Sequence, residues 1–195
     1  MAVIALRFRS TQASFLENTG FISEQVRDSG VAPTRGMIAG LLGAALGVKR
    51  GEKLPEVLAV ATHFRKPPKK GSDFAIIQNA LNFSGKLKGS HMITKYYLHD
   101  VDAVVLVEVP NKNYSQYIEA LKNPVYPIYF GRKSCIPTLP LLAAKQEWQE
   151  SSLGECLESR TSKNGVYLDS DSLPMPIKTQ FEFRKEVFQC YTMLN

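Results

Sequence analysis

The alternation of apolar and polar residues predicts several strands in the first two thirds of the chain. Residues 3–8 alternate and are β-branched at their start, which is typical of a strand whose outward positions include Arg7 and Arg9. Residues 101–109 form a strongly β-branched run that predicts a buried central strand. Residues 125–130 are predicted to form a further strand.

Two segments have the periodicity of amphipathic helices. In the first, Pro33-Thr34-Arg35 opens a helix that Gly47 closes, because proline suits the first turn and glycine the residue after the last. Gly36, Gly40 and Gly43 leave part of its surface without side chains, which indicates close packing against the chain's own sheet or against a ligand. Residues 111–122 are predicted to form the second helix. The side chains expected to face the core are those of Tyr114, Tyr117, Ile118 and Leu121.

A long polar and basic arm interrupts this pattern. Residues 65–71 read Arg-Lys-Pro-Pro-Lys-Lys-Gly, and residues 73–95 mix basic and apolar positions around Gly85 and Gly89, which favours a long hairpin or a flexible arm over a core element. The order strand, helix, strand-like segment with a long arm, strand, helix, strand is that of a ferredoxin-like α+β fold, which many RNA-recognition domains share. We expect this domain to span residues 1–145.

The remaining residues, 146–195, are predicted to form a small β-rich C-terminal extension. Their pattern is irregular at first and then gives short strands near residues 166–168 and 181–193, after the turn signal Asn164-Gly165. The chain has 195 residues and a hydrophobic content of 44%, which is enough for one well-filled domain. Its longest apolar run, residues 37–48, is far shorter than the roughly 20 residues that cross a bilayer, so we expect a cytoplasmic protein with no membrane contact.

The charge is concentrated in the arm. Residues 63–95 contain seven basic residues against one acid, Asp73, which equals the whole formal net charge of +6. This concentration favours an anionic partner such as a nucleic-acid backbone, and a solvated lysine-rich loop is the alternative. The basic residues are Arg65, Lys66, Lys69, Lys70, Lys86, Lys88 and Lys95.

The residues that carry catalytic chemistry elsewhere are sparse here. The sequence contains neither a phosphate-binding loop of the Walker type nor His or Cys pairs at metal-ligand spacing, so we expect no cofactor and no metal. His63, His91 and His99 could each act as a general base toward an RNA 2′-hydroxyl. A histidine without catalytic function is the favoured interpretation, because the spacing identifies no orienting partner. The sequence also gives Cys135 no base that would activate it as a nucleophile.

One further stretch combines aromatic residues with cations. The segment of residues 124–130 ends in aromatics and runs into Gly131, Arg132, Lys133 and Ser134. Backbone amides and side chains at such a turn could converge on phosphate oxygens, and a purely structural turn is the alternative.

Two long motifs resemble a known family. Residues 32–47, which read Ala-Pro-Thr-Arg-Gly-Met-Ile-Ala-Gly-Leu-Leu-Gly-Ala-Ala-Leu-Gly, resemble the first helix of CRISPR-associated protein family five. Residues 131–135, preceded by Pro-x-Tyr-Pro-x-Tyr, resemble a second signature of that family, particularly of its type I-E branch. Residues 95–100 and 181–188 are similar to two further family segments. The chain departs from the type I-E pattern after Gln12, where Ala13-Ser14-Phe15 stands in place of a tryptophan and a glycine.

The resemblance implies a modified ferredoxin-like domain of the RRM and RAMP type with a protruding β-hairpin thumb at about residues 63–98. It implies a non-catalytic subunit of Cascade, the antiviral surveillance complex, that clamps the 5′ handle of the guide RNA (crRNA) and caps the backbone filament. The implied partners are this RNA, the backbone subunit, the large subunit and, through the assembled complex, target DNA. The candidate RNA-binding residues are Gln12, Thr34, Arg35, Lys69, Lys70, Lys86, Lys88, Lys95, Tyr97, Gly131, Arg132, Lys133 and Ser134.

Two alternatives stay open at this point. In another CRISPR subtype the corresponding subunit cuts the precursor RNA, so a metal-independent endoribonuclease is one of them. The other is a general RNA-binding protein with a ferredoxin-like core, because fold does not fix function.

Overall fold

The computed structural model describes residues 1–15, 26–79, 81–82, 84–87, 89–138 and 140–142, together with the backbone of residues 166–170. Within these residues the strands are β1 (Ala2–Ala13), β2 (Val26–Arg27), β3 (Ala59–Phe64), β4 (Lys69–Ile77), β5 (His91–Val109) and β6 (Val166–Ser170). The helices are α1 (Arg35–Leu46), the short 3-10 helix η1 (Asn111–Asn113) and α2 (Tyr114–Lys122).

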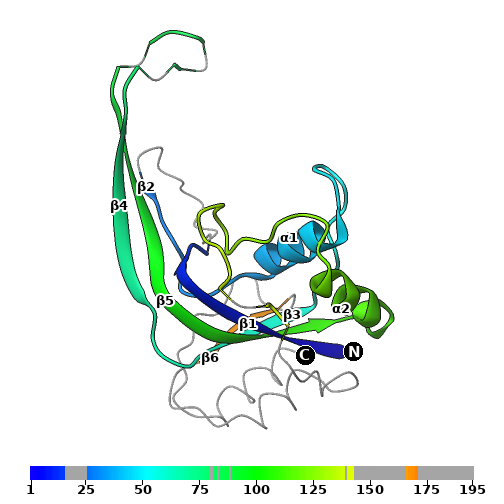
Figure 1. The fold of residues 1–195 in the computed structure, drawn as a ribbon. Coiled ribbons are helices and arrows are strands. Elements are labelled where there is room, and N and C mark those ends of the chain that lie inside the picture. The colour runs from blue at the N-terminus through cyan, green and yellow to red at the C-terminus, as the bar shows by residue number, and fades with distance from the viewer. Residues whose placement is uncertain are drawn as a thin grey trace.

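One long strand, β5, organises the sheet. In the described part of the chain the strand order is β1-β5-β3-β6, and β2 and β4 also pair with β5 (Figure 1). Residues 101–109 of β5 lie between β1 and β3 and are largely buried, as the sequence predicted for a central strand. Residues 91–99 continue beyond the body of the domain and pair antiparallel with β4. A single strand therefore contributes both to the core and to the arm.

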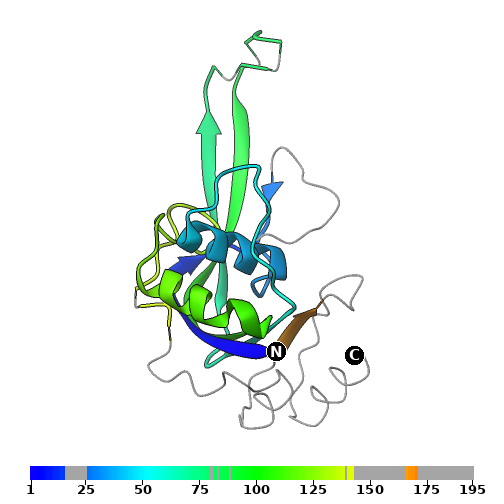
Figure 2. The ribbon, with the colours of Figure 1, turned by 90° about the vertical axis from the view of Figure 1, so that its right-hand side faces the viewer.

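The predicted hairpin is confirmed as a protruding thumb. Strands β4 and β5 extend together well away from the body of the domain in both views (Figures 1 and 2). Five large apolar side chains in its outer part are more than half exposed: Phe74, Ile76, Leu81, Leu87 and Met92. Such exposure on a projecting element is typical of a contact surface.

Both helices cover one face of the sheet (Figures 1 and 2). The Thr34 side chain caps α1 by accepting a hydrogen bond from the Met37 amide, and Gly47 ends the helix in the left-handed conformation with φ of 77°. Pro33 thus precedes the cap instead of entering the first turn. Helix α2 buries Tyr114, Tyr117 and Leu121 as predicted, while Ile118 is only partly buried.

The three glycines of α1, Gly36, Gly40 and Gly43, lie in two different environments. A Cβ atom at Gly43 would lie 3.2 Å from Leu54 and 3.5 Å from Pro55, so this glycine allows a close approach within the chain. No described atom other than the helix's own backbone and the adjoining residues lies within 4 Å of a Cβ built at Gly36 or Gly40. Only one of the three glycines is therefore explained by internal packing.

The prediction of a strand at residues 125–130 is wrong. The amides of Val125 and Tyr126 donate to the carbonyls of Ala45 and Ala44, each at 3.0 Å, and so satisfy the C-terminal end of α1 instead of a sheet. Residues 138 and 140–142 lie along the free edge of β1 instead, where the Arg7 amide donates to the Leu141 carbonyl at 2.6 Å. In this modified ferredoxin-like α+β fold, the edge of the sheet at β1 is thus covered by a loop that forms an isolated bridge, Leu6 with Leu142.

The predicted strand near residues 166–168 is confirmed as β6, which pairs antiparallel with β3 in the main sheet. The predicted strand at residues 181–193 lies outside the described residues, and the division of the chain at residue 145 stays a prediction. Among the described helices, none is long and apolar enough to cross a membrane.

Candidate nucleic-acid interface

The loop of residues 131–135 is closed by its own backbone. The Phe130 amide donates to the Cys135 carbonyl at 2.8 Å, and the Cys135 amide donates to the Arg132 carbonyl at 2.8 Å. Gly131 adopts φ of 91°, and a Cβ atom there would collide with the carbonyl oxygen of Ser14. Only glycine meets both conditions without strain, so this residue serves the turn.

The two ends of this loop are anchored in the core. The Phe130 ring is fully buried and stacks on Phe8, with ring centroids 4.2 Å apart. Cys135 is also fully buried, which leaves its thiol inaccessible as a nucleophile. Lys133 and Ser134, at the tip of the loop, are exposed. The loop therefore presents a cation and a hydroxyl on a fixed base.

Arg132 fastens this loop to the foot of the thumb. Its guanidinium donates to the carbonyl of Tyr96 on β5 at 3.1 Å and to the carbonyl of Arg27 on β2 at 3.0 Å. The same group lies over the ring of Tyr97, 4.5 Å from the centroid. The fold thus brings together two of the candidate RNA-binding residues, Arg132 and Tyr97, but as an internal contact. Two of the five guanidinium N–H groups are committed to it.

A second contact ties β2 to the thumb at the same place. The Lys70 ammonium lies 2.8 Å from the Asp28 carboxylate and 4.7 Å from the centroid of the Tyr96 ring. The hydrogen bond from Lys70 lowers the pKa of Asp28, against an opposing effect of partial burial. Sequence reasoning singled out neither Asp28, which belongs to no motif, nor Tyr96, which lies in the family-like segment of residues 95–100. Their meeting depends on the pairing of β2 with β5.

The candidates around α1 and β1 have local structural roles. Thr34 uses its hydroxyl as the helix cap, and Arg35 donates to the Val57 carbonyl at 3.4 Å while half-buried. Gln12 lies on β1 opposite His99, and its carbonyl accepts from the Ser10 hydroxyl at 2.8 Å. Figures 1 and 2 place the loop of residues 131–135 beside α1.

The lysines of the arm are spread along the thumb. Lys69 lies at its foot, 4.0 Å from Asp100, Lys95 is half-buried on β5, and Lys86 is exposed near the far end. Lys88 lies outside the described residues. Acids from outside residues 63–95 approach three of the basic residues, since Asp102 also lies 3.8 Å from Arg65. The local positive charge is therefore lower than the sequence window indicated.

His99 lies on β5 at the foot of the thumb. It is half-buried, its ring lies over Gly71, and its partner across the β4–β5 ladder is Lys69. Among the described residues there is no group of three side chains that could hold a metal ion.

Comparisons with known proteins agree with this architecture. A family model described as CRISPR-associated protein (Cas_Cas5) matches residues 3–179. The fold is similar to a chain of a solved CRISPR RNA-guided surveillance complex, with a TM-score of 0.64, 22% identity, and 85% of this chain and 76% of that chain covered.

A crystal structure described as a Cas protein is similar to the same extent. Its TM-score is 0.61 and its identity 23%, with 85% of this chain and 77% of that chain covered. A comparison with curated proteins found no match. The family match extends over most of the sequence and includes both the motif at residues 32–47 and the loop at residues 131–135. The chain therefore belongs to the Cas5 family of CRISPR-associated proteins.

Proposed function

We propose that this chain is a non-catalytic guide-RNA-binding subunit of a type I CRISPR surveillance complex, Cascade. In this function it clamps the 5′ handle of the RNA and caps the backbone filament. The observation that carries the proposal is the fixed loop of residues 131–135 beside the foot of a basic thumb. A loop held by Arg132 and Phe130 presents Lys133 and Ser134 with little loss of conformational freedom when a phosphate binds.

The start of α1 supports the same function. The first turn of α1, which the structure describes in full, contains no acidic residue. The positive end of the helix dipole is thus not neutralised by a side chain of its own first turn. Together with Arg35 and Lys133, it gives the region around the loop a positive potential that suits an RNA backbone.

The thumb supports assembly with the other subunits. It projects beyond the domain and exposes apolar side chains, which favours contact with the backbone subunit at the end of the filament. In the assembled complex the large subunit is the second protein partner. Target DNA is then recognised by pairing with the guide, while the protein contacts the guide through its backbone.

The test is co-expression of this chain with its neighbouring Cascade subunits and a CRISPR array, followed by purification through a tag on this chain and sequencing of the bound RNA. We expect a uniform guide RNA with a defined 5′ handle. Lys133→Gln should lower the yield of bound RNA several-fold, because an exposed cation leaves without disturbing the loop. Arg50→Gln, an exposed cation after α1, is the matched control and should have no effect. Heterogeneous RNA in the purified sample would instead indicate a general RNA binder.

The pairing of His99 with Lys69 is the observation that favours the alternative of metal-independent RNA cleavage. In such a reaction the imidazole would remove the proton of a 2′-hydroxyl and the ammonium would stabilise the developing charge. The proposed non-catalytic function predicts that a repeat RNA incubated with the purified chain in EDTA stays intact. Cleavage that His99→Ala abolishes would establish the nuclease.

A further inference from the structure

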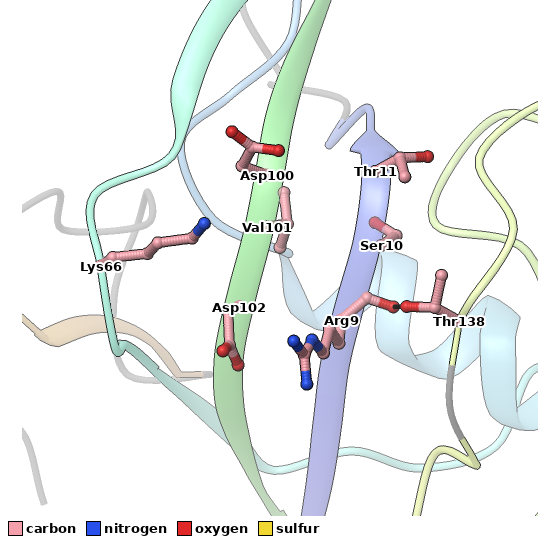
Figure 3. A pocket seen from close by; sticks show the side chains of 8 residues that line it. All are labelled: Arg9, Ser10, Thr11, Lys66, Asp100, Val101, Asp102 and Thr138. Carbon is pink, nitrogen blue, oxygen red and sulfur yellow. Dashed lines mark hydrogen bonds between the residues drawn. The ribbon is translucent and has the colours of Figure 1, made fainter.

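A hollow lies on the sheet between β1, β5 and the turn that leads into the thumb, with a volume of about 340 Å³ (Figure 3). Arg9 is exposed while Phe8 before it is part of the core under the helices, so strand alternation turns Arg9 to the opposite face. Figure 3 shows Arg9 and Lys66 extending toward β5 from opposite sides. The lining residues are Arg9, Ser10, Thr11, Lys66, Asp100, Val101, Asp102 and Thr138.

The hollow exists because the sheet ladder breaks at this point. The Arg65 amide donates to the Asp102 carbonyl at 2.9 Å, and regular pairing resumes only at Lys69 opposite His99. The turn between them contains Pro67 and Pro68, which have no amide donor for the ladder. Asp100 on β5 adopts φ of 56°, which bends the strand away from a regular course. The irregularity therefore opens a cavity where a continuous sheet would be flat.

The charges around this hollow leave a positive excess. The carboxylate of Asp102 lies 3.8 Å from Arg65, and that of Asp100 lies 4.0 Å from Lys69. In the parts of the chain that the structure describes, Arg9 and Lys66 have no ion-pair partner within the usual distance. Two cations thus face a cavity whose acids each have another cation nearby. Such an arrangement favours an anionic ligand.

We propose that this pocket holds one nucleotide of a single-stranded polynucleotide. Arg9 and Lys66, because they approach from opposite sides, contact the two phosphates that flank the nucleotide. The carboxylates of Asp100 and Asp102 accept hydrogen bonds from its amino or hydroxyl groups. The volume falls in the range of small-ligand sites. This proposal rests on the proposed function, which supplies the strand, but it adds a contact that is independent of nucleotide sequence.

The test uses the full chain and fluorescence anisotropy with three labelled probes. These are an oligoribonucleotide with the handle sequence of the host repeat, a scrambled version, and the scrambled sequence as DNA. The double variant Arg9→Gln with Lys66→Gln removes both pocket cations. Arg50→Gln with Lys53→Gln, two exposed cations after α1, removes the same charge elsewhere. Circular dichroism checks that all variants are folded.

We expect the pocket variant to weaken binding of the handle and scrambled RNA alike. Two lost phosphate contacts lower the slope of log K against log salt by about 1.4, since each contributes about 0.7 for a single strand. Extrapolated from 1 M salt, this change in slope corresponds to about a tenfold loss of RNA affinity at about 0.15 M salt. The control variant should change affinity by less than about twofold. An equal loss on DNA identifies the phosphates as the ligand, and a loss confined to RNA identifies a ribonucleotide.

Three results would overturn the pocket. They are unchanged affinity in the pocket variant, an equal loss in the control variant, and a wild-type chain that binds none of the probes. Failure of the proposed function looks different. In that case the wild-type chain binds handle and scrambled RNA equally, while the pocket variant still weakens both. If the wild-type chain prefers the handle RNA and the pocket variant binds it with unchanged affinity, only the proposal of a nucleotide pocket is refuted.

Discussion

Replacing Arg132 with glutamine tests whether this side chain holds the loop or contacts RNA. The change removes hydrogen bonds to the carbonyls of Tyr96 at 3.1 Å and Arg27 at 3.0 Å, and the contact with the Tyr97 ring at 4.5 Å. A charged hydrogen bond contributes about 1.5–3 kcal/mol when buried, and we use about 1 kcal/mol for each because Arg132 is half-buried. The cation–π contact adds about 0.5 kcal/mol.

The summed loss is about 2–3 kcal/mol in the free energy of unfolding. For a chain of this size it lowers Tm by about 5–10 °C. The assay is thermal unfolding followed by circular dichroism, with RNA affinity measured on the same preparations. Arg132→Lys keeps the charge but has no planar fork with which to reach two carbonyls in different directions. We therefore expect the lysine variant to recover less than half of the lost stability and little of the RNA affinity.

The reasoning is refuted by the opposite pattern. If Arg132→Gln keeps the wild-type Tm but loses RNA affinity, and Arg132→Lys restores that affinity, then the charge acts on phosphate directly. The loop would in that case be held by Phe130 and the backbone alone.

Two glycines and one ion pair give the remaining predictions. Gly131→Ala should destabilise the chain by about 2 kcal/mol or more, because φ is positive and the new Cβ would meet the backbone of Ser14. Gly40→Ala in α1 should stabilise the chain by about 0.5–1 kcal/mol, because alanine favours a helix and the new Cβ would meet no neighbour. The Tm of each variant tests both predictions. Lys70 lowers the pKa of Asp28, so this pair stabilises the fold above the unfolded pKa of about 3.9 and the benefit is lost as pH falls through the folded pKa. Asp28→Asn should therefore make Tm fall less steeply as the pH is lowered. The stability lost in this variant at neutral pH should be less than about 1 kcal/mol, because both side chains are about half exposed. An unchanged dependence of Tm on pH would contradict a stabilising ion pair.

The bounds of α1 could be predicted because they depend on neighbouring residues. Thr34 caps its own helix and Gly47 supplies the left-handed residue at its end, and both interactions lie within one turn. The buried run of β5 was also predictable, since a continuous β-branched segment has to be covered on both faces. Local chemistry and periodicity were sufficient for these elements.

Residues 125–130 show where local chemistry was not sufficient. Their aromatic and β-branched residues favour a strand, but Val125 and Tyr126 donate to the end of α1, which is distant in sequence. A strand needs a neighbouring edge, and residues 138 and 140–142 lie along the available edge of β1. Propensity alone could not decide which of the two segments would lie there.

The same distinction applies to the candidate site. The number of cations in the arm could be counted from the sequence, and the family resemblance predicted a basic hairpin that projects from a ferredoxin-like body. Which of these cations meet an acid depends on the tertiary structure, because Coulomb energy depends on separation in space and not along the chain. Asp28 approaches Lys70 through the pairing of β2 with β5, whereas Arg9 and Lys66 meet at a broken ladder with a cavity between them.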